Sequence, residues 1–110
     1  MTNDKTGAEA IVSATDGGYS IAVDGETVGL AAVADRGEQR VFYHTEVGER
    51  FRGRGLADVL IDEALQATRA DGKRVVATCP MVAAYLKKHP GFRDITDPVT
   101  PKILQWVETL

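Results

Sequence analysis

Hydrophobic and polar residues alternate along the first half of the chain with the two-residue period that is typical of β-strands. The alternation predicts strands over residues 19–23 and 40–47, and a weaker strand is expected over residues 10–14. Residues 27–34 predict a further strand that is apolar on both faces and built of small side chains. Asp24-Gly25 is a strong two-residue hairpin signal, because both residues tolerate a positive φ angle. We therefore expect an antiparallel meander in which each strand pairs with the next.

The predicted strand over residues 40–47 divides its side chains between two faces. Strict alternation gives two sets of neighbours, Val41, Tyr43, Thr45 and Val47 on one face and Phe42, His44 and Glu46 on the other. His44 is thus expected to share a face with Phe42 and Glu46.

After residue 54 the hydrophobic period lengthens to three or four residues, which predicts an amphipathic helix over residues 55–71. Gly72 is typical of the position just after a helix. A short buried strand is expected over residues 74–78. Pro80 then suits the first position of a second helix, which runs to Lys88 and must end before Pro90.

This order of elements predicts an α+β fold with a mixed, mostly antiparallel sheet and two main helices. The helix between the strands at residues 40–47 and 74–78 is a crossover long enough for a parallel pair. We divide the chain into a flexible N-terminal tail (1–8), a domain (9–93) and a C-terminal extension (94–110). Residues 102–110 are compatible with a short helix that covers the core or contacts a second copy through an apolar stripe of Ile103, Trp106, Val107 and Leu110.

The composition of the chain argues against several classes of function. The chain has 110 residues, the size of one domain, and its 13 basic and 16 acidic residues give a net charge of −3. This balance argues against a nonspecific nucleic-acid binder, which needs an excess of basic residues to neutralise phosphates. No stretch approaches the roughly 20 apolar residues that span a bilayer. Cys79 is the single cysteine, so an internal disulfide and a thiolate zinc cluster are excluded. We expect a cytoplasmic protein with no metal and no membrane or nucleic-acid partner.

The junction between the third long strand and the first helix, VGERFRGRGLA over residues 47–57, is the most informative stretch. Gly53 and Gly55 allow a sharp turn that exposes backbone N–H groups, and the helix start adds unpaired donors and a partial positive charge. Three arginines lie in the same loop: Arg50, Arg52 and Arg54. The pattern favours an anion pocket suited to phosphate or pyrophosphate, although an arginine-rich surface loop has the same composition. It is neither a Walker loop nor a dinucleotide fingerprint.

Residues 52–57, RGRGLA, match the R-x-x-G-x-G/A signature of the GNAT acetyltransferase superfamily. The ordered set HTEV, RGRGLA and TCPMVAAYLKKHP closely resembles a small, minimal GNAT-like family with a Cys-Pro motif after the last core strand. The resemblance implies a V-shaped gap between the strands at residues 41–47 and 74–78 that takes acetyl-CoA as co-substrate. It assigns the following residues to coenzyme binding: Thr45, Glu46, Val47, Arg52, Gly53, Arg54, Gly55, Leu56, Ala57 and Tyr85.

The chain departs from the superfamily pattern at three points, one of which is Gly48-Glu49, where the family often has proline. In the superfamily, a tyrosine of the last helix lies four residues before a Gly-Phe pair. In this chain that pair is Gly91-Phe92, so the position is occupied by Lys87, and Tyr85 lies two residues before it. Larger GNAT enzymes also have helices between the first strands that shape the acceptor site, and here Asp24-Gly25 leaves no room for them.

Two residues are candidates for chemistry. Cys79 precedes Pro80 at the start of the second helix, where a thiolate nucleophile is stabilised, so it could carry the acetyl group. The alternatives are direct attack by the acceptor amine, or a cysteine that only fills the core. His44 is a candidate general base for the acceptor ammonium, or else a structural histidine.

The sequence therefore predicts an N-acetyltransferase that acts on an unidentified amine, a small molecule or a protein, as a monomer or weak homodimer. A CoA-binding regulatory or structural module with little catalysis is the alternative. A nucleic-acid adaptor that uses the arginine loop as a phosphate clamp is disfavoured by the net charge of −3.

Overall fold

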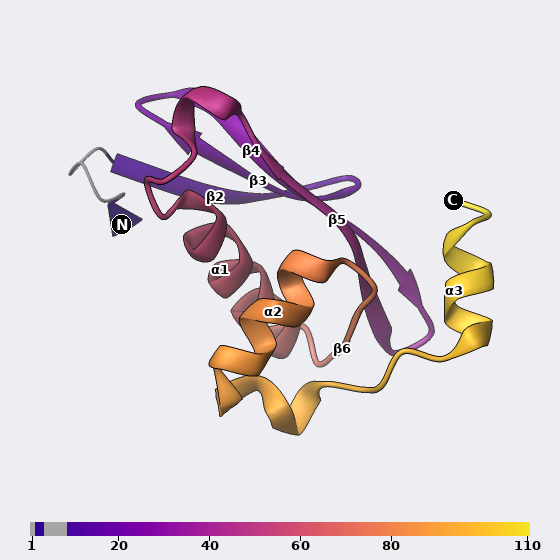
Figure 1. Ribbon diagram of the computed structural model, residues 1–110. Coiled ribbons are helices and arrows are strands. Elements are labelled where there is room, and N and C mark those ends of the chain that lie inside the picture. The colour runs from indigo at the N-terminus through magenta and orange to yellow at the C-terminus, as the bar shows by residue number, and fades with distance from the viewer. Residues whose placement is uncertain (1, 4–8) are drawn as a thin grey trace.

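The computed structural model describes residues 2–3 and 9–110, which form one mixed sheet with helices on both faces (Figure 1). The strands are β1 (Thr2–Asn3), β2 (Glu9–Thr15), β3 (Gly18–Val23), β4 (Glu26–Arg36), β5 (Gln39–Val47) and β6 (Arg74–Ala77). The helices are η1 (Glu49–Phe51), α1 (Leu56–Ala70), α2 (Pro80–Lys88), η2 (Pro90–Ile95) and α3 (Pro101–Val107).

The strands lie in the sheet in chain order, from β1 to β6. All neighbours are antiparallel except β5 and β6, which pair in parallel across the α1 crossover. The predicted hairpin at Asp24-Gly25 is present, and both residues have positive φ angles of 49° and 85°. The predicted meander and parallel crossover are therefore confirmed.

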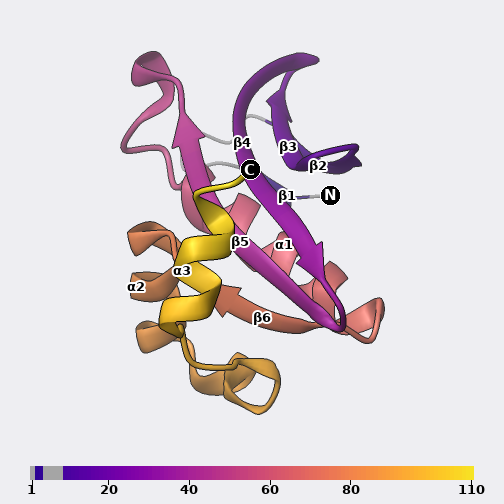
Figure 2. The ribbon, with the colours of Figure 1, turned by 90° about the vertical axis from the view of Figure 1, so that its right-hand side faces the viewer.

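Helices α1 and α2 cover one face of the sheet, and α3 stands on the opposite face near β5 and β6 (Figures 1 and 2). The main core lies between the sheet and α1, where Ile21 and Phe42 pack against Leu60 and Leu65. A smaller cluster on the other face joins Val41 and Val76 to Ile103 of α3. The predicted C-terminal helix thus covers the sheet, but Leu110 of its predicted stripe is exposed.

A β-bulge in β5 overturns the strict alternation predicted for that strand. The pairing with β4 passes from Ala32↔His44 to Val33↔Phe42, so Tyr43 has no partner residue of its own. The extra residue reverses the alternation: Phe42 and Thr45 are both buried, whereas His44 is exposed. His44 therefore does not share a face with Phe42, contrary to the prediction, although it still lies beside Glu46.

Two segments differ from the sequence predictions at the ends of the chain. Thr2–Asn3 pair with β2, within the stretch predicted to be a flexible tail, and the rest of that tail lies outside the described residues. Helix η2 was not predicted. It leads into a strap in which Thr96 bridges to Val75 in parallel and the Asp97 N–H donates to the Val75 carbonyl at 2.8 Å.

Candidate functional site

Strands β5 and β6 separate beyond Phe42, which leaves half of one β5 edge without a partner strand. The ladder between them ends at Phe42↔Ala77. The N–H groups of Thr78 and Cys79 both donate to the Phe42 carbonyl at 3.0 Å, and the chain then turns into α2. Residues 44–47 are paired with β4 alone among the described strands. The gap predicted between the two strands is therefore present.

A cleft of about 610 Å³ occupies this gap and extends to the start of α1. Its volume is in the range usual for small-molecule sites. Most of the predicted coenzyme-binding residues and His44 line it, together with Phe51, Asp58 and Met81, which the sequence did not single out. The full lining is His44, Thr45, Glu46, Val47, Phe51, Arg52, Gly53, Gly55, Leu56, Ala57, Asp58 and Met81.

The glycine-rich junction forms the floor of the cleft at the start of α1. Gly53 and Gly55 both have φ angles of 79°, in the left-handed region that favours glycine. Gly55 is the N-cap of α1, and no side chain caps this helix. Within the described part of the chain, the N–H groups of Gly53 and Gly55 donate to no backbone carbonyl. These donors and the helix dipole make the junction suited to an anion.

The three arginines of the junction have different surroundings. Arg52 lines the cleft. Arg50 and Arg54 lie over the Phe51 ring instead, with their guanidinium carbons 5.3 and 5.0 Å from its centroid. Because Phe51 itself lines the cleft, these cation–π contacts hold the wall of the cleft in place. Binding of a phosphate by Arg54, as the sequence suggested, stays a prediction.

His44 and Glu46 form a pair at the mouth of the cleft. The His44 Nε2 lies 3.8 Å from a Glu46 carboxylate oxygen, and the two side chains are 57% and 61% exposed. Both line the cleft. The pair is accessible to a solvated amine and can accept a proton from it.

Cys79 is buried at the N-cap of α2. Its Sγ lies 3.6 Å from the Thr45 hydroxyl, and Thr45, not Cys79, lines the cleft. The predicted position of the cysteine between β6 and the second helix is correct. Thr45 separates its thiol from the open part of the site.

Tyr85 is buried between the two helices, and its hydroxyl donates to an Asp62 carboxylate oxygen of α1 at 2.8 Å. Its ring stacks on His89, with centroids 3.8 Å apart. Burial, together with Asp62, raises the pKa of Tyr85 above its ordinary value. Tyr85 lies outside the cleft but lines an adjoining hollow that shares Ala57, Asp58 and Met81 with it. Coenzyme binding by Tyr85 stays a prediction.

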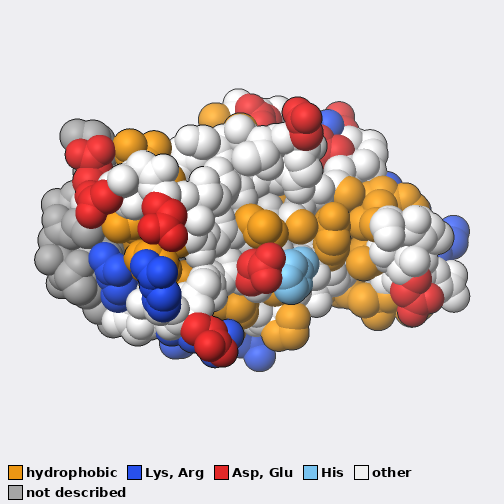
Figure 3. All heavy atoms as spheres, turned by 90° about the horizontal axis from the view of Figure 1, so that it is seen from above, with side chains coloured by type: hydrophobic (Ala, Val, Ile, Leu, Met, Phe, Trp, Pro, Cys, Tyr) orange, Lys and Arg blue, Asp and Glu red, His pale blue; other side chains and the backbone are white. Residues whose placement is uncertain are grey.

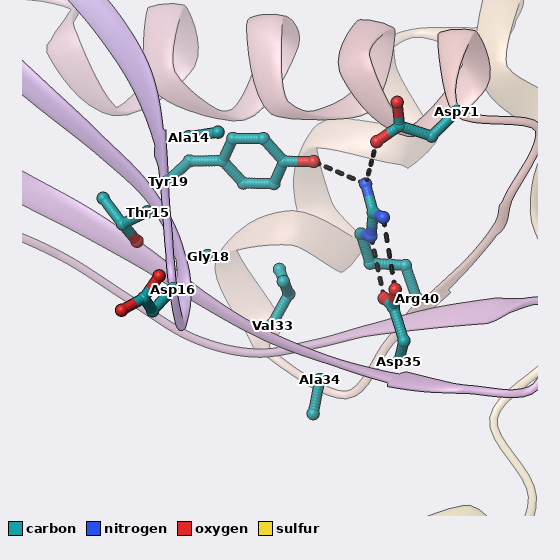
Figure 4. Close-up of a pocket in the computed structure, with 10 residues that line it drawn as sticks. All are labelled: Ala14, Thr15, Asp16, Gly18, Tyr19, Val33, Ala34, Asp35, Arg40 and Asp71. Atoms are coloured by element: carbon teal, nitrogen blue, oxygen red, sulfur yellow. Dashed lines mark hydrogen bonds and ion pairs between the residues drawn. The ribbon is translucent and has the colours of Figure 1, made fainter.

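A second hollow, of about 350 Å³, lies at the other end of α1 and is built around Arg40 (Figure 4). The Arg40 guanidinium donates to Asp35 at 2.8 and 3.2 Å, to Asp71 at 2.8 Å and to the Tyr19 hydroxyl at 2.7 Å. The hydrogen bonds that Arg40 donates to the Asp35 carboxylate raise the pKa of Arg40 above its ordinary value. Lys73 Nζ lies 4.0 Å from Asp35, so two cations, Arg40 and Lys73, balance Asp35 and Asp71, and we interpret this cluster as a structural brace.

The described residues bring together no group of three or more histidine, cysteine or acidic side chains that could hold a metal ion. Over the same residues, no helix combines the length and hydrophobicity needed to cross a membrane.

Comparisons with known proteins agree with this architecture. The model of the GCN5-related N-acetyltransferase family matches residues 18–95. No curated protein matches the chain by sequence. The solution structure of a GCN5-like protein from Staphylococcus aureus superposes with a TM-score of 0.64 at 14% identity, over 83% of this chain and 91% of that one.

Two larger proteins share the fold. Ribosomal-protein-S18-alanine N-acetyltransferase from Escherichia coli has a TM-score of 0.56 at 10% identity, over 72% of this chain and 50% of that one. Ard1 from Thermoplasma volcanium has a TM-score of 0.52 at 25% identity, over 69% of this chain and 55% of that one. The chain thus spans about half the length of these two proteins. With the family model covering β3 to η2, including the whole cleft, the chain belongs to the GCN5-related N-acetyltransferase family.

Proposed function

We propose that the protein transfers the acetyl group of acetyl-CoA to a primary amine, with the coenzyme in the cleft between β5 and α1. One observation carries the proposal: the unpaired β5 edge and the uncapped start of α1 belong to a single cleft. An extended chain of amides fits a strand edge, and a pyrophosphate fits a helix N-terminus. Acetyl-CoA has both groups in series and is the co-substrate of this family.

Different residues of the cleft would bind different parts of the coenzyme. The backbone of residues 45–47 would pair with the amides of the pantetheine arm, because this edge has no partner strand among those described. The N–H groups of Gly53 and Gly55 and the side chain of Arg52 would hold the pyrophosphate. Leu56 and Met81 supply apolar contacts beside them. All these residues lie in the proposed domain of residues 9–93.

The pair of His44 and Glu46 is placed to prepare the acceptor. The acceptor enters as an ammonium ion, which must lose a proton before its nitrogen can attack. The His44 imidazole, oriented by Glu46 at 3.8 Å, takes that proton. The nitrogen then bonds to the thioester carbonyl carbon and the carbon–sulfur bond breaks. The nitrogen releases a second proton and the departing thiolate gains one, so the products are an amide, CoA-SH and one proton held by the base.

We favour direct attack by the amine over an acetyl-cysteine route. The Cys79 thiol is buried and contacts the cleft through Thr45. A covalent route would need Thr45 to move aside before the thiol could reach a thioester. In the direct route, Cys79 positions Thr45 and the start of α2.

A CoA-binding module with little catalysis is the second candidate. It is favoured by the direct turn between β3 and β4 and by the absence, in the described residues, of any helix before η1. Such a protein would bind the coenzyme but lack walls around an acceptor.

The test combines thermal unfolding with mass spectrometry in the presence of acetyl-CoA and a panel of amines. A ligand that binds only the folded state raises the unfolding temperature. Stabilisation together with acetylated amine supports the enzyme, and stabilisation without product supports the module. Absence of stabilisation at millimolar acetyl-CoA would contradict both.

A further inference from the structure

A shallow groove of about 280 Å³ runs along the ends of β4 and β5 and opens into the cleft. It is lined by Thr27, Val28, Gly29, Leu30, Glu46, Val47 and Gly48. Glu46 and Val47 line both the groove and the cleft, so the two are continuous. A molecule in the groove therefore lies beside Glu46, whose carboxylate is 3.8 Å from His44 at the mouth of the cleft.

The lining of the groove has one charged group and little other polarity. Glu46 stands opposite Leu30 in the β4–β5 register, and the Leu30 side chain is 38% exposed. The remaining lining is apolar or backbone, apart from the Thr27 hydroxyl. A single carboxylate beside an apolar surface matches an ammonium group on an uncharged aliphatic stem. A sugar with several ammonium groups would need several carboxylates and many hydrogen-bonding partners here.

The groove lies on the part of the sheet that α3 leaves uncovered. Helix α3 packs over Val41 and Val76, at the other end of β5. Figure 3 views this face and shows apolar surface around a histidine and an adjacent acidic side chain. The open surface leaves room for the rest of a large acceptor to remain outside the groove.

We infer that the acceptor is the side-chain amine of a lysine on an extended polypeptide, with its aliphatic stem over Leu30 and its nitrogen between Glu46 and His44. The inference rests on the proposed function. The step is the transfer already described: the lysine nitrogen gains the acetyl carbon, CoA leaves with its sulfur, and the base keeps one proton.

The experiment compares two probes and a pair of matched variants. The probes are a short peptide with a blocked N-terminus and one lysine, and the aminoglycoside kanamycin. The variants are Leu30→Lys, in the groove, and Ile11→Lys, on β2 outside it, where the side chain is 47% exposed. Each introduces the same cation at an exposed apolar position of the sheet, so their folding can be compared directly.

Wild type is expected to acetylate the peptide in preference to kanamycin. Leu30→Lys should raise the KM for the peptide by about tenfold or more, the change that corresponds to ~1.4 kcal/mol. It should leave the thermal shift by acetyl-CoA unchanged. Leu30→Ser, which removes the apolar contact without adding charge, should give a smaller increase in the same direction. Ile11→Lys should leave the KM as in wild type.

The remaining outcomes distinguish the inference from the proposed function. Equal effects of Leu30→Lys and Ile11→Lys, or preference for kanamycin, overturn the assignment of groove and acceptor. Binding of acetyl-CoA without acetylation of the peptide also overturns it, while the coenzyme site stands. Failure to bind acetyl-CoA refutes the proposed function itself.

Discussion

The two ends of α1 are built in opposite ways. At its start, Gly55 provides no side-chain cap, and within the described residues the N–H groups of Gly53 and Gly55 donate to no backbone carbonyl. At its end, the C-cap Asp71 shares Arg40 with Asp35 and Tyr19 from the sheet, so the polar groups of this cluster are paired with one another. A polar group left without a protein partner can bind a ligand, whereas one already paired holds elements together. This difference, more than the size of either hollow, separates the candidate site from the brace.

The largest expected effect comes from Gly55→Val at the start of α1. A β-branched side chain at φ 79° strains the turn and covers the N–H donors. Loss of two charge-assisted hydrogen bonds should weaken acetyl-CoA by about 100-fold or more, measured by calorimetry. Gly72→Val is the matched control, because φ is 71° just after the other end of the helix. It should cost similar stability yet keep coenzyme affinity. Equal loss of affinity in both variants would contradict the anion site.

Arg40→Met tests the brace. The substitution keeps the length and apolar stem of the side chain but removes the cation that Asp35 and Asp71 share, and among the described residues Asp35 then keeps only Lys73, whose Nζ lies 4.0 Å away. Because the Asp35 and Asp71 carboxylates are exposed and only Arg40 is largely buried, the loss of these contacts and of the Tyr19 hydrogen bond should lower the free energy of unfolding by about 1.5 kcal/mol, measured with urea. Coenzyme affinity of the folded fraction should not change. Arg36→Met, on an exposed residue at the end of the neighbouring strand β4, serves as the control and should change stability by less than about 0.5 kcal/mol.

Cys79→Ala distinguishes the two chemical routes at the cleft. With direct attack, the variant should bind acetyl-CoA normally and keep kcat within about tenfold of wild type, with a stability loss of about 1 kcal/mol from the core. Intact mass spectrometry of wild type should show no acetyl adduct. An adduct on Cys79, together with complete loss of turnover in the variant, would establish the covalent route instead.

The smallest expected effect is the pH dependence of the strap at Asp97. Hydrogen bonds from Gln39 and Arg74 hold the pKa of Asp97 below its ordinary value of 3.8. A carboxyl whose pKa falls on folding stabilises the fold above its unfolded pKa, and this contribution disappears as pH falls through the folded pKa. Asp97→Asn should therefore cost less than about 1 kcal/mol at pH 7 and nothing near pH 2. Urea unfolding at both pH values measures this, and an equal cost at both would exclude ionisation as the cause.

Local signals explain which parts of the fold were predictable. The Asp24-Gly25 turn and α1 follow from short-range sequence rules, since φ preference and helical period act over a few residues. The glycine junction was also recognisable because its chemistry lies in one continuous stretch. The resemblance to a known family added the coenzyme.

Other features depend on residues that are far apart in sequence. The bulge at Tyr43 adds one residue without changing the composition of β5, so strict alternation placed His44 on the wrong face. The Arg40 brace joins residues separated by up to 31 positions, and no local pattern indicates it. Thr45 and Cys79 meet only because β5 and β6 separate at Phe42. Such contacts are consequences of the sheet register and appear only when the strands are paired.

The strap at Thr96 and Asp97 also affects how copies of the protein behave toward one another. Strand β6 lies at the edge of the sheet, so the N–H and C=O groups of its outer side could pair with a strand of another molecule. The bridge from Thr96 and the hydrogen bond from Asp97 occupy Val75 on that edge. Residues 96 and 97, which follow the family match at residue 95, thus leave Val75 unable to pair with a strand of another copy.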